Sequence, residues 1–201
     1  MKVTILDYGA GNVPSVESAL QRLGAESHRT DSPECVCKAE ALLLPGVGHY
    51  AALVRALDEK RLRAPLVDAI LRGVPFLGIC LGLQVLFRLS EEAGHLRGLN
   101  LVPGIVSALP PTVKLPHMGW NQVARKRESS LLSGIDADAY FYFAHSFAAL
   151  DAQDATVATC SHGAEFTAVI EHNNIYAVQF HPEKSGAPGA RVLQNFLRLA
   201  A

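Results

Sequence analysis

The stretch Gly78-Ile79-Cys80-Leu81-Gly82-Leu83-Gln84 connects an apolar run, Pro75 to Ile79, to a segment with helical apolar spacing, Leu81 to Leu89. Its first and second glycines flank the cysteine in the G-x-nucleophile-x-G pattern of a nucleophile elbow. In such a turn the glycines let the helix pack closely on the strand, and the central residue is held strained above the sheet edge. The sequence therefore predicts a strand, a sharp turn at Cys80 and a helix.

A thiol at this turn has two interpretations. At a helix N-terminus the macrodipole favours the thiolate, which is the nucleophilic form of cysteine. An unreactive structural role is also common, since free cysteine is among the most buried residue types. The turn alone makes Cys80 a candidate nucleophile and leaves both interpretations open.

In the first half of the chain, on both sides of this turn, apolar strands alternate with amphipathic helices. This order is typical of a parallel sheet that is covered on both faces. The chain from about residue 94 instead carries short alternating segments, which predict antiparallel strands. We expect one α/β domain over residues 1–201, with a mostly parallel central sheet, helices on both faces and a β-rich second half. The expected strands are 2–8, 41–44, 75–79, 101–109, 140–147, 156–160, 166–171 and 175–180, and the helices are 13–23, 51–72 with a break or a second start at Pro65, 81–89 and 190–200.

Composition excludes several classes of protein. The 201 residues are 49% hydrophobic and 18% charged, with a net charge of -1, which gives no electrostatic case for binding nucleic acid. No apolar run approaches the roughly 18 residues that span a bilayer, and the N-terminus has no cleavable apolar segment. With so large an apolar share, the four cysteines are not needed as disulfides. We expect a cytoplasmic protein with reduced thiols and no membrane contact.

The segment from Gln179 to Lys184 follows a predicted strand and contains His181-Pro182-Glu183. Side chains two residues apart in extended chain project to the same side, and proline restricts the backbone between them. A carboxylate beside an imidazole sets its tautomer and stabilises the imidazolium. Alone the pair is more often an ordinary surface pair, but with Cys80 it supplies a base and its orienting group. The order Cys, His, Glu differs from the Ser, Asp, His order of α/β-hydrolases, which disfavours that class.

A glycine-rich turn, Pro45-Gly46-Val47-Gly48, follows the strand at 41–44. Backbone N–H groups in such a turn can be aimed at a developing oxyanion. By itself, the segment is more often a plain turn between a strand and a helix. Its value as a site therefore depends on the other motifs.

Together these three motifs resemble the class I (triad) glutamine amidotransferase family. The resemblance implies that the Cys80 thiolate attacks the carboxamide of L-glutamine, and that His181, oriented by Glu183, transfers the protons. It implies no cofactor and no metal. The oxyanion donors that it implies are Val47, Gly48 and Leu81, and the implied glutamine contacts are Gly46, Gln84, Glu92, Ser146 and Phe147.

Further segments resemble one branch of this family in register along essentially the whole chain. The most discriminating is Leu115-Pro116-His117-Met118-Gly119-Trp120-Asn121. The resemblance implies a heterodimer in which ammonia passes through a protected channel to a separate synthase (cyclase) subunit. The interface residues that it implies are Asn12, Met118, Trp120 and Lys184.

The sequence disfavours a dinucleotide site and a metal site. Gly9 and Gly11 follow the first strand, but the third glycine of a dinucleotide fingerprint would fall at Pro14. Cys35-x-Cys37 lacks a second Cys/His pair at metal-ligand spacing.

Two alternative functions remain open at the level of sequence. One is a glutaminase that serves another synthase, of the pyridoxal phosphate or guanylate-forming type. The other is a catalytically silent regulatory subunit of the same fold, which requires that Cys80 be unreactive.

Overall fold

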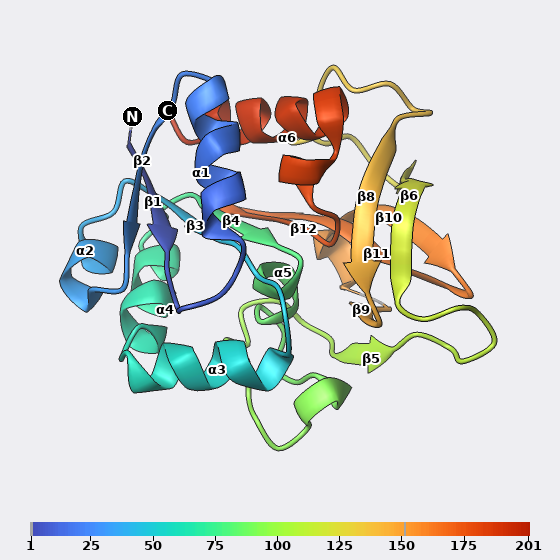
Figure 1. The fold of residues 1–201 in the computed structure, drawn as a ribbon, viewed down its shortest axis with the longest axis horizontal. Coiled ribbons are helices and arrows are strands. Elements are labelled where there is room, and N and C mark those ends of the chain that lie inside the picture. Colours follow the sequence, from blue (N-terminus) through green and yellow to red (C-terminus); the bar gives the residue numbers. More distant parts are fainter. Residues whose placement is uncertain (1, 151) are drawn as a thin grey trace.

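The computed structural model describes residues 2–150 and 152–201, in which a central eight-stranded sheet has the order β2-β1-β3-β4-β12-β11-β10-β7 (Figure 1). The strands from β2 to β12 in this order pair in parallel, and those from β12 to β7 pair antiparallel. The expected α/β fold with a β-rich second half is confirmed. The sheet strands are β1 (Lys2–Leu6), β2 (Glu26–Thr30), β3 (Ala41–Leu44), β4 (Phe76–Ile79), β7 (Ala124–Arg125), β10 (Thr156–His162), β11 (Ala164–His172) and β12 (Ile175–Val178).

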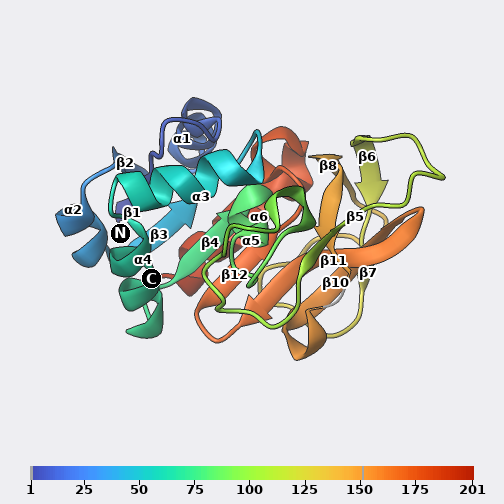
Figure 2. The same cartoon turned by 90° about the horizontal axis from the view of Figure 1, so that it is seen from below.

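Smaller antiparallel pairs extend the β-rich half beside the main sheet. Strand β5 (Val106–Ala108) pairs with β9 (Phe147–Ala149), and β6 (His117–Gln122) pairs with β8 (Tyr140–His145). Figure 2 shows the β6–β8 pair at the end of the molecule that is remote from α2 (Pro33–Cys37).

Helices cover both faces of the parallel part of the sheet. Helices α1 and α6 pack against one hydrophobic cluster, and α2, α3 and α4 pack against the other (Figure 1). Along β3, Ala41 and Leu43 join the first cluster, and Leu42 and Leu44 join the second, which explains why this strand is apolar throughout. Within the described ranges, none of the helices combines the length and apolar character that crossing a membrane requires. The remaining helical segments are α1 (Val13–Arg22), α3 (Tyr50–Glu59), α4 (Arg63–Leu71), α5 (Leu81–Gln84), α6 (Gly186–Leu199), η1 (Glu91–Ala93), η2 (Gln153–Ala155) and η3 (Pro182–Lys184).

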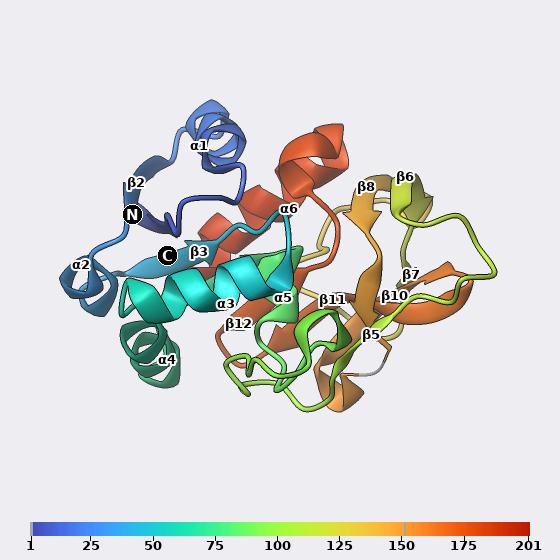
Figure 3. The same cartoon turned by 60° about the horizontal axis from the view of Figure 1, so that its bottom comes forward.

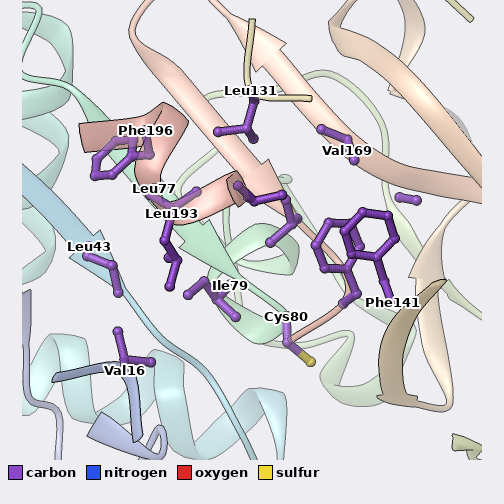
Figure 4. Close-up of a cluster of buried hydrophobic side chains, with 14 of the residues drawn as sticks. Val16, Leu43, Leu77, Ile79, Cys80, Leu131, Phe141, Val169, Leu193 and Phe196 are labelled. Atoms are coloured by element: carbon purple, nitrogen blue, oxygen red, sulfur yellow. The ribbon is translucent and has the colours of Figure 1, made fainter. Parts of the chain in front are cut away.

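Cys80 lies at the margin of the first hydrophobic cluster. Figure 4 shows its sulfur at the edge of a group that includes Leu43, Ile79 and Phe141. The Phe141 ring stacks on Phe180 with centroids 4.1 Å apart, next to the strand that leads to His181. The turn that carries the cysteine therefore rests on a closely packed core.

Helix α5 is shorter than its apolar spacing predicts. The expected helix 81–89 ends at Gln84, because the following carbonyls accept hydrogen bonds from another segment instead of continuing the helix. Gly98 N–H donates to the Arg88 carbonyl at 2.9 Å, and Leu99 N–H donates to the Val85 carbonyl at 2.7 Å. The short helix lies beside α3 and β12 (Figure 3).

The predicted helix 51–72 is divided into two helices, and the second one starts two residues before Pro65. Helix α3 ends at Glu59, Arg61 takes a φ of 56°, and α4 begins at Arg63. Pro65 is the third residue of α4, where its missing N–H costs nothing because first-turn donors have no intrahelical partner.

Replacing Gly82 by alanine should destabilise the fold strongly. A Cβ at this position would lie 2.0 Å from the Leu44 carbonyl oxygen, which belongs to the backbone of β3 and cannot move alone. We expect Gly82→Ala to lower the free energy of unfolding by about 3 kcal/mol, measured by denaturant unfolding. Gly94→Ala is the matched control, since its Cβ would meet nothing closer than 4.0 Å. Equal stabilities of the two variants would contradict the close packing.

Candidate active site

Cys80 is held in a strained turn between β4 and α5. Its φ of 55° and ψ of -105° lie in a region that non-glycine residues rarely occupy. Its N–H donates to the Val178 carbonyl of β12 at 2.8 Å, which ties the turn to the neighbouring strand. The residue is only 4% exposed, and Gln179 Nε2 donates to its sulfur at 3.6 Å. The predicted elbow geometry is thus present.

His181 lies immediately after β12 and is brought to Cys80 by the pairing of β12 with β4. Its Nδ1 lies 3.0 Å from Glu183 Oε1, with both side chains almost fully buried. Burial lowers the His181 pKa, but the hydrogen bonds with Cys80 and Glu183 outweigh it and raise the pKa to about 10. The site therefore favours an imidazolium between a sulfur and a carboxylate.

Asn12, which the resemblance places at a subunit interface, lies against Glu183 in the structure. Its Nδ2 donates to Glu183 Oε1 at 3.3 Å, and its Oδ1 accepts from Ser15 Oγ at 2.8 Å. The other carboxylate oxygen of Glu183 is buried and has no hydrogen-bond partner among the described residues. Asn12 thus helps to hold the carboxylate that faces His181.

The Pro45–Gly48 loop lies directly over the start of α5. A Cβ on Gly46 would lie 2.4 Å from Leu81 Cβ, so only glycine permits this approach. The Val47 N–H donates to the Tyr8 hydroxyl at 3.3 Å, and that hydroxyl donates to the Val47 carbonyl at 3.5 Å. Burial raises the Tyr8 pKa to about 12, which keeps the phenol neutral. In this conformation the Val47 N–H is therefore engaged by Tyr8.

Leu81 occupies the first position of α5, directly after Cys80. A backbone N–H at this position has no intrahelical acceptor and is available to a bound anion. Gly48, with a φ of 94°, lies across the same cavity. Leu81 and Gly48 therefore both line the cavity that Cys80 lines.

A cavity of about 380 Å³ opens beside the Cys80 sulfur. Most of the glutamine contacts that the resemblance implies line this cavity, although they come from three separate parts of the chain. Gly46 is the exception, because it contacts α5 rather than the cavity. The lining residues are Val47, Gly48, Cys80, Leu81, Gln84, Glu92, Pro116, Ala144, His145, Ser146, Phe147, His181 and Lys184.

Two polar side chains in the cavity are suited to an amino-acid ligand. Glu92 Oε2 accepts from the Tyr50 N–H at 2.9 Å, which orients an anionic group in the cavity wall. Gln84 Nε2 donates to the Phe147 carbonyl at 2.8 Å. Gln84 Oε1 is buried and has no partner in the described part of the chain, so it can accept a hydrogen bond from a ligand.

An exposed apolar surface adjoins the cavity on strands β6 and β8. Met118 and Trp120 are 66% and 56% exposed, which is unusual for such large apolar side chains. Trp120 meets the Tyr142 ring edge-on, and the Lys184 ammonium lies 5.7 Å from the centroid of the same ring. Since Lys184 also lines the cavity, this surface continues from β6 to the cavity mouth.

Several polar residues of the site were not singled out as site residues from the sequence. Gln179 contacts the sulfur, His145 lines the cavity, and Tyr8 engages the loop over α5. The one available signal was the position of Gln179 at the end of a strand, two residues before His181. Nothing in the local spacing marks His145 or Tyr8.

Comparison with protein families gives one match that spans nearly the whole chain. The model of "Glutamine amidotransferase class-I" matches residues 4–200. Curated proteins named "Imidazole glycerol phosphate synthase subunit HisH" are similar to the chain at high coverage. The one from Methanothermobacter thermautotrophicus is 47% identical, covering 98% of each chain, and the one from Salinibacter ruber is 44% identical, covering 98% of this chain and 94% of the relative.

Solved structures share the fold at low sequence identity. A structure titled "Crystal structure of glutamine amidotransferase" superposes with a TM-score of 0.79, at 18% identity and 98% coverage of both chains. A structure of PurLQS from Thermotoga maritima gives a TM-score of 0.77, at 19% identity, covering 100% of this chain and 99% of that one. These similarities support the fold alone.

Proposed function

This chain belongs to the class-I glutamine amidotransferase family, and from that premise we propose that its cavity hydrolyses L-glutamine as the glutaminase subunit of imidazole glycerol phosphate synthase, in histidine biosynthesis. The observation that carries the chemistry is the position of Cys80 at the strained turn, beside the buried His181–Glu183 pair and open to the cavity. The subunit assignment rests on the relatives that share 41–47% of their residues with this chain over nearly its full length.

The first half of the reaction transfers the γ-glutamyl group to sulfur. The Cys80 thiolate attacks the carboxamide carbon, a C–S bond forms, and the electron pair of the C=O bond moves to oxygen. The His181 imidazolium then gives its proton to the nitrogen as the C–N bond breaks, so ammonia leaves and a thioester remains. The raised pKa of His181, to about 10, keeps that proton available at neutral pH.

The second half of the reaction returns the enzyme to its starting state. Neutral His181 takes a proton from water, whose oxygen attacks the thioester carbon. The C–S bond breaks, glutamate leaves, and the thiolate–imidazolium pair is restored. Glu183 stabilises the imidazolium in both halves, and Asn12 holds Glu183 in place.

Backbone N–H groups stabilise the oxyanion in both tetrahedral intermediates. Leu81 supplies one donor at the start of α5, and the Val47–Gly48 part of the loop supplies the other. The loop donor requires a change of conformation, because the Val47 N–H is bonded to the Tyr8 hydroxyl in this structure. Glutamine hydrolysis, and with it the release of ammonia, is therefore slow until the loop changes conformation.

The cavity recognises glutamine through complementary charges and hydrogen bonds. The Glu92 carboxylate binds the α-ammonium group, and the unpartnered Gln84 Oε1 accepts from a substrate N–H. Ser146 and Phe147 also line the cavity. Gly46 acts indirectly, by allowing the loop to approach α5.

The partner is the cyclase subunit, which forms a heterodimer with this chain and receives ammonia through a protected channel. Met118 and Trp120 form the apolar part of the docking surface, and Lys184 connects it to the cavity mouth. Asn12 contributes through Glu183. This biosynthetic assembly works in the cytoplasm on small molecules, without nucleic acid, cofactor or metal.

The partner should stimulate hydrolysis, and this is the experiment that tests the proposed function. Glutamate release is measured for the chain alone, with the candidate cyclase, and with the cyclase plus an analogue of its substrate. We expect the liganded partner to increase the rate of glutamate release at least about tenfold, because in the free chain the Val47 N–H donates to Tyr8 and not to the oxyanion. Equal rates in all three mixtures would argue for a free-standing glutaminase, and no turnover in any would argue for a silent subunit.

A further inference from the structure

A chain of hydrogen bonds connects strand β6 with the Cys80 sulfur through side chains of which only Gln84 also has a role in the proposed reaction. Its members lie on β6, β8, β9, α5 and the segment after β12. We call it the Asn121–Cys80 chain. Its links are Asn121 Nδ2 to His117 Nε2 (3.3 Å), His117 Nδ1 to His145 Nε2 (3.1 Å), His145 Nδ1 to the Phe147 carbonyl (2.9 Å), Gln84 Nε2 to the same carbonyl (2.8 Å), Gln84 Nε2 to Gln179 Oε1 (3.1 Å) and Gln179 Nε2 to Cys80 Sγ (3.6 Å).

The Phe147 carbonyl sets the direction of the links that lead to the sulfur. A carbonyl oxygen only accepts, so the Gln84 atom that faces it must be the amide nitrogen. The same nitrogen lies 3.1 Å from Gln179, so its second N–H requires an acceptor there, which is Gln179 Oε1. The remaining end of Gln179 is then its NH₂ group. Gln179 is fully buried and therefore presents a donor, not an acceptor, to Cys80.

The same carbonyl sets the direction of the histidine links. His145 Nδ1 must donate to the Phe147 carbonyl. Burial lowers the pKa of His145 to about 3 and that of His117 to about 4, so each ring carries one N–H. His145 Nε2 is then an acceptor, His117 Nδ1 donates to it, and His117 Nε2 accepts from Asn121. Asn121 Nδ2 also donates to the Ser161 carbonyl at 3.1 Å, which anchors this end.

The histidine pair is connected to the sulfur through the Phe147 carbonyl oxygen, which has two lone pairs. His145 takes one and Gln84 takes the other, so neither side chain can turn without leaving a buried donor unpaired. His117 is held in turn by ring stacking, with centroids 4.8 Å from Phe143 and 4.2 Å from His162. The whole chain therefore has one arrangement of donors and acceptors.

We propose that Gln179 is a positioning residue, whose amide N–H holds and stabilises the Cys80 thiolate, and that the His117–His145 pair supports the orientation of Gln179 through the shared Phe147 carbonyl. A charge-assisted hydrogen bond to the sulfur lowers the free energy of the thiolate relative to the thiol. It also holds the sulfur beside the cavity. This inference rests on the proposed glutaminase function only for its catalytic consequence, since thiolate formation is measured without glutamine.

The test on Gln179 measures thiolate formation directly. Gln179→Glu is isosteric and keeps an acceptor for Gln84, but it places a carboxylate oxygen next to the sulfur in place of the N–H donor. Gln179→Met removes the donor without adding charge. The rate of Cys80 alkylation by iodoacetamide is followed by mass spectrometry between pH 5 and 10. We expect both variants to be alkylated about tenfold more slowly at pH 7, with the midpoint of the profile shifted toward alkaline pH.

Thr167→Val is the matched control for these variants. It removes the hydrogen bond between Thr156 and the buried Thr167, which does not belong to the Asn121–Cys80 chain. Its alkylation profile should match that of the parent protein. Thermal unfolding of all variants shows which are folded, and only folded variants are compared.

The test on the histidines uses pairs of variants that separate the hydrogen bonds from ring packing. His145→Asn retains a donor near the position of Nδ1, whereas His145→Phe retains a ring without a donor. His117→Phe breaks the chain, whereas His162→Phe replaces the other ring of the same stack and leaves the chain intact. With the cyclase present, we expect kcat for glutamine to fall about fivefold to tenfold in His145→Phe and His117→Phe, to fall less in His145→Asn, which keeps only the link to the Phe147 carbonyl, and to stay within about twofold in His162→Phe.

The outcomes separate this inference from the proposed function. Parent-like alkylation profiles in a folded Gln179→Glu or Gln179→Met would overturn the inference, even if the parent protein hydrolyses glutamine. Slowed alkylation in these variants, together with no glutamine turnover by the parent protein, would support the inference and refute the glutaminase. Equal kcat values for His117→Phe and His162→Phe would remove the histidine pair from the inference and confine it to Gln179. If neither Gln179 variant folds, parent-like kcat in His145→Phe overturns it.

Discussion

Cys80→Ala should abolish glutamine-dependent synthesis by the complex with the cyclase and leave synthesis from added ammonium salt intact. Without the sulfur no thioester forms, and the loss should exceed about 10⁴-fold, since removing a nucleophile from a triad has effects of that size. The fold should tolerate the change because Cys80 lies at the margin of its cluster. Both activities are measured on the same preparation, which makes the ammonium-dependent rate an internal test of assembly.

Cys160→Ala is the matched control, since it removes a second buried thiol on β10, away from the cavity. Burial raises the Cys160 pKa to about 12, so that thiol stays protonated and unreactive. A glutamine-like diazo-ketone should label Cys80 in the parent protein and in Cys160→Ala. Loss of both synthetic activities in Cys80→Ala, or of neither, would count against Cys80 as the nucleophile.

Glu183→Gln should lower kcat for glutamine by about 10²-fold or more and change its pH dependence, since a positioned acid or base contributes about 10²–10⁴-fold. The amide keeps nearly the same shape but removes the negative charge that faces His181 Nδ1 at 3.0 Å. The His181 pKa, which is raised to about 10 in the parent protein, should therefore fall. We expect the alkaline limb of the kcat profile to move to lower pH, because the ring loses the proton that ammonia must receive.

The raised pKa of His181 also determines how the stability of the folded chain depends on pH. The His181 pKa lies above its ordinary value of 6.5, so the charged ring stabilises the folded chain fully below about pH 6.5, and this contribution is lost as the pH rises through about 10. Glu183→Gln should therefore be less stable than the parent protein at pH 6, with the difference shrinking toward pH 10. Thermal unfolding across this range measures the effect.

Glu165→Gln is the matched control for Glu183→Gln. Glu165 also has a cationic partner, Lys126 at 2.9 Å, but both side chains are exposed and remote from the cavity. Its kcat profile should match that of the parent protein. An unshifted alkaline limb in Glu183→Gln would show that the carboxylate does not set the protonation of His181.

Much of the fold could be inferred from local pattern, and the failures have physical reasons. Strand β3 was placed correctly because a strand buried on both faces is apolar throughout. Strand β2 was not found, because it lies at the edge of the sheet and its sequence, Glu26–Thr30, is polar and mostly exposed. The helix predicted at 81–89 is longer than α5, because apolar spacing does not show that N–H groups of residues 98–102 donate to the carbonyls that would have extended the helix.

The functional site likewise has parts that the local sequence predicts and parts that it does not. The turn at Cys80 and the His181–Glu183 pair are short-range features: the first depends on glycines two residues on either side, and the second on two positions of an extended segment. Each could be predicted without knowledge of the fold, and so could their combination in one site. By contrast, Asn12 was expected at an interface, and only the structure places it against Glu183, 171 residues away in the sequence.

Local sequence is enough to predict the strained cysteine turn, the imidazole–carboxylate pair and the alternating α/β order, because these depend on steric and spacing rules within a few residues. Which atoms face the sulfur depends instead on how the whole chain packs. The Gln179 amide, the His145–His117 pair and the Tyr8–Val47 contact join groups that are 28 to 99 residues apart. The reason is that each buried donor must find an acceptor among the groups that packing brings near, and packing is a property of the whole chain.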